Sequence, residues 1–93
     1  MPFYVYILAC FKDKIFSCYY TGQTDNLYRR TGQHFDIVCE KDTNHFVGRF
    51  DFVKLIWHRV VDTREDALRL ESYLKQRTPP EKESYMDKFG TRH

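Results

Sequence analysis

The amino-acid sequence predicts a small α/β (α+β) fold in which a three-stranded antiparallel sheet is flanked by helices. Two runs rich in β-branched and aromatic residues, 3–11 and 15–22, are separated only by a short polar break, which favours an antiparallel hairpin. A third such run, 51–61, carries apolar residues at alternate positions of both parities, which indicates a strand covered on both faces. The expected order is strand, strand, helix, strand, helix, helix.

Length and composition predict one domain over residues 1–93. The 93 residues fit a single domain, no internal repeat or linker divides them, and aromatic residues make up 17% of the chain. The apolar run 3–11 has no basic leader or cleavage site and is shorter than the ~20 residues that cross a bilayer. The three cysteines favour neither a disulfide framework nor a zinc site. We therefore expect a soluble, cytoplasmic protein without a membrane partner.

A first helix is expected to follow the hairpin, from about Asn26 to His34. Thr24 or Asp25 can cap it, because their side chains accept hydrogen bonds from unpaired backbone N–H groups. Residues 35–50 show no clear periodicity and are expected to form the longest loop.

One face of this helix is polar. Asn26, Arg30 and His34 recur every four residues and therefore share a face, while Leu27 and Thr31 flank them and point towards the core. Taken singly, each of these polar residues fits an ordinary solvated face with an exposed histidine.

Two further helices are expected after the third strand. Thr63 is placed to cap the first of them, which should end near Arg77. Thr78 and Glu81 have the spacing of a capping box around a proline, so they open a last short helix that stops at Gly90.

Glu71 is unusual because it lies on the apolar stripe of its helix. Ala67, Leu70 and Leu74 mark the inner face, and Glu71 falls between the two leucines. A carboxylate facing inwards costs several kcal/mol unless it is paired or binds a metal. The alternative is that Glu71 lies at the edge of the stripe or pairs with a nearby Arg or Lys.

Tyrosines near the strand ends complete a possible cleft. Tyr4 and Tyr6 share one face of the first strand, and Tyr20 lies near the end of the second strand, on the opposite face from Tyr19. Each fits a buried core tyrosine when taken alone. A hairpin and two flanking helices can nevertheless bring five polar side chains to one cleft. These are Tyr6, Tyr20, Arg30, His34 and Glu71.

The sequence resembles the GIY-YIG nuclease superfamily. The resemblance rests on VY at 5–6, YTG at 20–22, the following QTDNLYRR with a histidine, and a later LESYLK segment. It extends from Phe3 to about Arg77 and is closest to the small stand-alone branch, a nuclease domain with nothing attached.

This resemblance implies a metal-dependent endonuclease that hydrolyses DNA phosphodiester bonds with Mg²⁺ or Mn²⁺. It assigns Arg30 to two phosphate oxygens and Glu71 to the metal. Tyr6 would be the general base, in a phenolate form favoured by a nearby cation such as Arg30 or by a metal-bound water. Tyr20 would hold the phosphate or the nucleophile in line. His34 would bond Tyr6 or a phosphate oxygen.

Several positions depart from the family pattern. Tyr4 stands in place of the glycine of the first motif, and Thr21 in place of the isoleucine of the second. Gln23 replaces a lysine of some relatives, which removes a charge facing phosphate. No asparagine follows Glu71 as it does in many larger relatives, so its role is vacant or filled otherwise.

Charge gives only a modest indication of DNA binding. The net charge is +2 and the pI about 8.5, below the value of ~9 that marks an outright nucleic-acid binder. A partner protein, or branched or damaged DNA met in repair or recombination, would then supply specificity. The expected backbone contacts are Gln23, Arg29, Lys54, Arg59, Lys75 and Arg77.

Two other functions stay open. One is an inactive module of the same fold that binds DNA or RNA. The other is a protein-interaction subunit, which exposed apolar surface around Tyr85, Met86 and Phe89 would favour.

Overall fold

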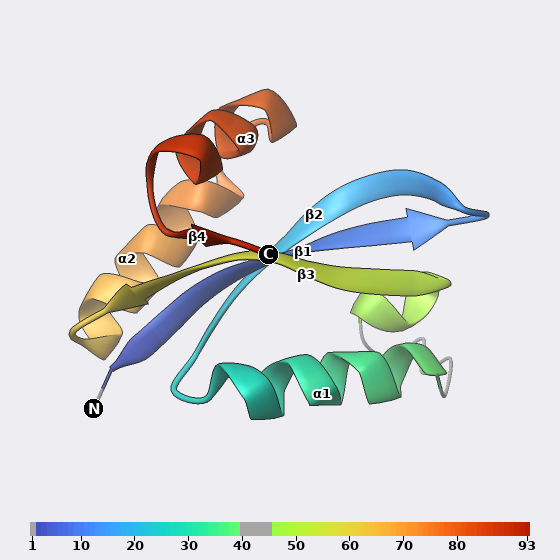
Figure 1. Ribbon diagram of the computed structural model, residues 1–93, viewed down its shortest axis with the longest axis horizontal. Helices are drawn as coiled ribbons and strands as arrows, with labels where there is room; N and C mark the ends of the chain where they lie inside the picture. Colours follow the sequence, from blue (N-terminus) through green and yellow to red (C-terminus); the bar gives the residue numbers. More distant parts are fainter. Residues whose placement is uncertain (1, 40–45) are drawn as a thin grey trace.

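The computed structural model describes residues 2–39 and 46–93, and it confirms an α+β fold built on an antiparallel sheet (Figure 1). The strands are β1 (Phe3–Lys12), β2 (Ile15–Thr24), β3 (Phe52–Val61) and β4 (Thr91–Arg92). The helices are α1 (Leu27–Cys39), a 3₁₀ turn η1 (Phe46–Arg49), α2 (Arg64–Lys75) and α3 (Pro79–Lys88).

The prediction of three strands is wrong, because the described part of the chain forms a four-stranded sheet in the order β2-β1-β3-β4. The additional strand, β4, follows the last helix and pairs with β3 through Trp57↔Arg92 and His58↔Thr91. It is only two residues long, too short to show the two-residue alternation by which a strand is found in a sequence.

The prediction of a loop over residues 35–50 is also wrong in part. Residues 35–39 continue α1, and residues 46–49 form η1. Residues 40–45 of the predicted loop lie outside the described residues.

A two-residue turn closes the β1–β2 hairpin, as predicted from the short polar break. Asp13 and Lys14 both have positive φ, 53° and 65°. Such a pair matches the twist of the flanking strands. The backbone N–H of Asp13 donates to the Asp51 carboxylate at 2.7 Å, which ties the turn to the start of β3.

The helix starts are set by side-chain caps, two of them at the predicted residues. Thr63 accepts from the N–H of Asp66 at 3.1 Å, and Thr78 with Glu81 forms a complete capping box. The predicted cap of α1 is wrong. The helix is capped by Asn26, whose Oδ1 accepts a hydrogen bond from the backbone N–H of Arg29 at 3.0 Å. Thr24 cannot take this position because it is the last residue of β2.

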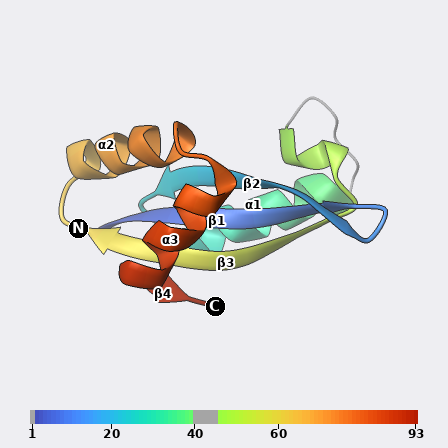
Figure 2. The ribbon, with the colours of Figure 1, turned by 90° about the horizontal axis from the view of Figure 1, so that it is seen from above.

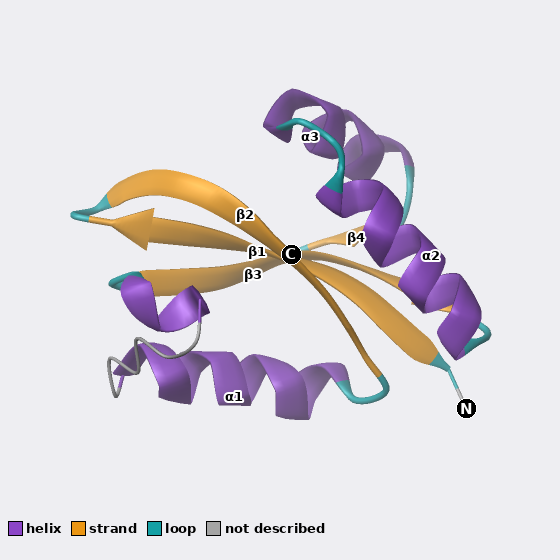
Figure 3. Ribbon diagram, turned by 180° about the vertical axis from the view of Figure 1, so that it is seen from behind, coloured by secondary structure: helices purple, strands orange, loops and turns teal. Residues whose placement is uncertain are grey.

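Helices cover both faces of the sheet, with α2 and α3 on one and α1 with η1 on the other (Figures 1, 2 and 3). Each face has its own core. The first contains Val5, Ile7, Trp57, Ala67, Leu74 and Met86. The second contains Tyr6, Leu8, Cys10, Val38, Val47 and Val53. No helix among the described residues is long and apolar enough to span a membrane.

An irregularity in β3 corrects the predicted facing of its side chains. The sequence pattern places Val53, Leu55 and Trp57 on one face, yet Val53 and Leu55 pack on the α1 side and Trp57 on the α2 side. The register explains this, because Ile7 pairs with Trp57 while the next residue, Leu8, pairs with Leu55. The extra residue in β3 reverses the alternation from there on.

Gly90 ends α3 and allows the chain to turn back into β4. Its φ is +73°, and a Cβ there would lie 2.6 Å from both the carbonyl oxygen of His58 and Nε1 of Trp57. The same indole N–H donates to the carbonyl oxygen of Phe89 at 2.7 Å. Only glycine fits at this position without displacing the largest side chain of the core.

We expect Gly90→Ala to lower the free energy of unfolding by about 1–3 kcal/mol, because it adds backbone strain to a steric clash. Gly32→Ala is the matched control. It lies inside α1 with open space around its Cβ position, and should be neutral or stabilising by about 0.5–1 kcal/mol. Urea unfolding of both variants checks this, and equal stability of the two would contradict it.

Candidate active site

A buried tyrosine–histidine pair joins β1 to α1. The hydroxyl of Tyr6 and Nε2 of His34 are hydrogen bonded at 2.7 Å. Tyr6 is 1% exposed and His34 is 2% exposed. The interpretation of His34 as an exposed residue of a solvated helix face is therefore wrong. Two polar groups taken out of water in this way must satisfy each other.

The pair depends on the absence of a side chain at Gly22. Gly22 lies directly opposite Tyr6 in the β1–β2 register. A Cβ at Gly22 would lie 2.4 Å from the Tyr6 hydroxyl oxygen, well inside van der Waals contact. The glycine therefore provides the space in which the Tyr6 hydroxyl meets His34.

Arg30 and Tyr20 adjoin this pair. Burial by itself would lower the pKa of the half-buried Arg30 guanidinium, but its interactions with the hydroxyls of Tyr6 and Tyr20 raise that pKa overall. The ring of Tyr20 meets the ring of His34 edge-on, with centroids 5.1 Å apart. Arg30 also donates to Oε1 of Gln33 at 3.1 Å, one turn further along α1.

Glu71 lies on α2, which covers the opposite face of the sheet from α1 (Figure 1). Its side chain is 19% exposed and lies 3.8 Å from Nζ of Lys75, so the lysine partner that sequence reasoning offered as an alternative is present. The carboxylate also acts on Tyr6, because its negative charge is one of the groups that raise the tyrosine pKa. Tyr6 is thus hydrogen bonded to His34, while the charges of Arg30, Tyr20 and Glu71 act on its pKa.

A small hollow opens beside these groups. It has a volume of about 40 Å³ and is lined by Tyr20, Arg30, His34, Ile37, Phe46 and Val47. Sequence reasoning did not find Phe46 and Val47 as part of the site, because η1 has no periodic pattern from which their position could be predicted. A water molecule needs about 10–15 Å³ of such space, so the hollow has room for about three waters or one small polar group.

Comparison with known proteins decides the family. Residues 2–85 match the model of the GIY-YIG catalytic domain. The protein belongs to the GIY-YIG family. A "UPF0213 protein" of Limosilactobacillus reuteri (strain DSM 20016) is 33% identical over 88 residues, covering 95% of this chain and 85% of that protein.

Two relatives from Streptococcus agalactiae, serotypes V and III, carry the same UPF0213 name. Each is 29% identical over 86 residues, covering 92% of this chain and 89% of the relative. These names state no activity. No solved structure shows significant similarity to this GIY-YIG chain.

Tyr6 of this GIY-YIG domain is held protonated at neutral pH. The pKa of Tyr6 is raised to about 12, chiefly by burial and in smaller part by the charges of Tyr20 and Glu71. Arg30 lowers the pKa, as the sequence analysis expects, but its effect is smaller than that of burial. Arg30 by itself therefore does not produce the phenolate expected of a general base at neutral pH, and the role of Tyr6 as the base stays a prediction.

The residues at the site fit a divalent cation only with help from a substrate. Among the described residues, no group of three or more His, Cys, Asp or Glu side chains could hold a metal ion. Glu71 supplies one carboxylate. Mg²⁺ is commonly bound by one or two carboxylates together with waters and substrate phosphates, so a substrate phosphate would complete this site.

The side chains expected to contact DNA come from different elements of the fold and have different local partners. Arg29 is exposed and pairs with Asp25 at 2.9 Å, and Lys54 is exposed on β3. Lys75 lies beside Glu71 at the site. Gln23 lines a separate hollow, together with Arg64 of α2.

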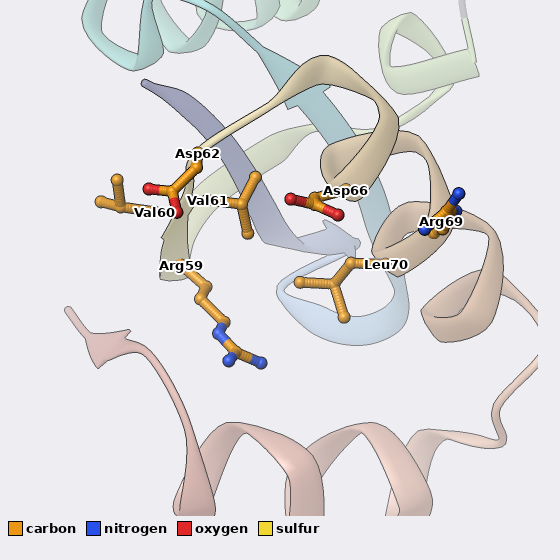
Figure 4. A pocket seen from close by; sticks show the side chains of 7 residues that line it. All are labelled: Arg59, Val60, Val61, Asp62, Asp66, Arg69 and Leu70. Carbon is orange, nitrogen blue, oxygen red and sulfur yellow. The ribbon is translucent and has the colours of Figure 1, made fainter. Parts of the chain in front are cut away.

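Arg59 and Arg77 are held by aromatic rings. The guanidinium of Arg77 lies 4.8 Å from the ring centroid of Tyr73. The guanidinium of Arg59 lies 5.1 Å from the ring centroid of Phe89. Arg59 also lines a hollow of about 490 Å³ between β3 and α2 (Figure 4), which contains none of the five predicted catalytic residues.

We expect Tyr6 to ionise only near pH 12, because burial disfavours its charged form. The folded pKa is raised, so its contribution to stability is full below the unfolded value of ~10 and is lost as pH rises towards 12. The difference between tyrosinate absorbance titrations of the native protein and Tyr6→Phe measures this pKa. A difference curve centred at or below pH 10 would contradict the assignment.

Proposed function

We propose that this protein is a metal-dependent endonuclease that hydrolyses DNA phosphodiester bonds at the site formed around Tyr6. The observation that carries the proposal is the buried hydrogen bond between Tyr6 and His34, beside a hollow that Arg30 and Tyr20 also line. The charge of the Glu71 carboxylate acts on Tyr6 as well. Proton-transfer, cationic and metal-binding groups are what phosphodiester hydrolysis requires. Membership of a family of endonucleases supports the same reaction.

Arg30 is proposed to hold the scissile phosphate. A guanidinium is charged at all working pH values and can donate two parallel hydrogen bonds to an anion. Its interactions with the two tyrosine hydroxyls orient it beside the hollow before substrate arrives. The hydroxyl of Tyr20 lies within the same group and is proposed to keep the phosphate in line with the attacking water.

Tyr6 and His34 are proposed to act together as the proton acceptor. Because Tyr6 stays protonated, its hydroxyl takes the proton of the attacking water only as it gives its own proton to Nε2 of His34. Imidazole exchanges protons near neutral pH, which a buried tyrosine does not. The 2.7 Å separation of the two atoms is within the range required for this transfer.

Glu71 is proposed to hold Mg²⁺ or Mn²⁺ together with the substrate phosphate. The cation, when bound, would polarise the phosphate and stabilise the leaving oxygen. Lys75 balances the charge of the Glu71 carboxylate in the free protein and can turn to a DNA phosphate when a cation takes its place.

A branched or damaged DNA, met in repair or recombination, is proposed as the substrate. The net charge of only +2 and the scattered basic side chains support specificity from DNA shape or from a partner protein rather than from tight duplex binding.

The last helix gives little support to a protein-interaction role. Met86 is 2% exposed, and Tyr85 packs edge-on against Trp57 with ring centroids 5.8 Å apart. Phe89 is 45% exposed but lies under the Arg59 guanidinium. The apolar residues expected to form a docking surface are therefore largely used within the fold.

We expect Glu71→Gln and Arg30→Lys each to lower the rate of DNA cleavage by about 10²–10³-fold, the usual loss when one group that stabilises the transition state is removed. Arg69→Lys is the matched control, because Arg69 is exposed on α2 and is neither a candidate catalytic residue nor an expected DNA contact. Cleavage of single-stranded, duplex and branched DNA, and of RNA, would be measured with Mg²⁺, with Mn²⁺ and with EDTA. Cleavage that survives Glu71→Gln would contradict the proposal, and binding without cleavage would indicate an inactive module.

A further inference from the structure

The described residues place an exposed aromatic ring at the mouth of the proposed site. Phe46, the first residue of η1, stacks on Tyr20 with ring centroids 5.9 Å apart and planes at 22°. Its ring also meets the edge of Phe50 at 5.3 Å. Even so, 46% of Phe46 stays exposed, so the contacts within the fold leave nearly half of it accessible to a ligand.

The ring lies beside the groups proposed to bind phosphate. Phe46, Arg30 and His34 line the same hollow of about 40 Å³. A water molecule needs about 10–15 Å³ of such space, so the hollow has room for about three waters and is too small for a nucleobase. A base attached to a phosphate held by Arg30 must therefore lie outside the hollow, where the exposed part of Phe46 is available.

The chemistry of the neighbouring groups favours a nucleotide over an apolar peptide as the ligand. A nucleotide joins an anion to a flat aromatic base. The site sets a guanidinium and an aromatic ring side by side on α1 and η1. A purely apolar peptide would leave the Arg30 charge without a partner, at a cost in desolvation.

We propose that Phe46, supported by Tyr20, is a stacking subsite for the base next to the scissile phosphate. This inference rests on the proposed nuclease function and names its substrate class. A base in an uninterrupted duplex is stacked between its neighbours and is not available to Phe46. The preferred substrates are therefore single-stranded segments, such as the flaps and unpaired arms of branched DNA.

Binding of a single-stranded DNA oligonucleotide that carries 2-aminopurine tests the subsite. The titration is made in EDTA, so that no cleavage is needed for a signal. We expect the native protein to quench the fluorescent base. Phe46→Ala and Phe46→Leu should lose the quenching and weaken binding about tenfold, whereas Phe46→Trp should keep both. Phe46→Leu keeps apolar packing but has no ring, so it separates stacking from simple filling of space.

Phe52→Leu is the matched control, because Phe52 is 53% exposed but does not line the hollow. A matched duplex should bind the native protein and all the variants alike. Absence of quenching by the native protein would overturn the proposal. Native-like binding and quenching by Phe46→Leu would also overturn it. The same holds if Phe46→Leu weakens the binding of single-stranded and of duplex DNA equally.

Cleavage assays with Mg²⁺ or Mn²⁺ separate this inference from the proposed function. Quenching that depends on Phe46, with no cleavage of any substrate, would uphold the stacking subsite and contradict the nuclease. If the protein cleaves DNA and Phe46→Leu keeps the native preference for single-stranded over duplex DNA, the nuclease function is upheld and the stacking subsite is contradicted.

Discussion

The hydrogen bond between Tyr6 and His34 is the interaction on which the proposed site depends. It connects the central strand β1 to α1 and fixes the face of α1 that also carries Arg30. Gly22 makes it possible, because any side chain there would occupy the position of the tyrosine hydroxyl. The space at Gly22 on β2 therefore allows β1 and α1 to pack together through the Tyr6–His34 hydrogen bond. This buried contact is also part of the candidate site.

Burial determines which chemistry these groups can carry out. A tyrosine alone in this position is a poor base, since burial outweighs the nearby guanidinium and keeps its pKa at about 12. The same burial strengthens its interactions with charged neighbours. The structure therefore favours a relay through Tyr6 to His34 over a tyrosine phenolate. Glu71 lies on α2, in the opposite helical layer, and its negative charge helps to raise the pKa of Tyr6.

Sequence reasoning succeeded where the signal is local and failed where it depends on tertiary contacts. Thr78 with Glu81 is a capping box that four consecutive residues determine, and it forms as predicted. The five candidate residues were found by helical and strand periods together with a resemblance. Three of them, Tyr20, Arg30 and His34, line one hollow, and Tyr6 is hydrogen bonded to His34. Glu71 lies on α2 and acts on Tyr6 through its charge. The reversed facing of Trp57 follows from one extra residue in a strand pairing, and Phe46 joins the site only through packing of η1, so neither could be predicted from local pattern.

A double-mutant cycle on single-turnover DNA cleavage, with Tyr6→Phe, His34→Gln and the two combined, tests the joint action of this pair most directly. Thermal unfolding of each variant would confirm that it is folded. If the two side chains act as one proton acceptor, the double variant should be slowed about as much as either single variant, to within roughly threefold. Losses that multiply, or a Tyr6→Phe variant that cleaves at the native rate, would contradict the account.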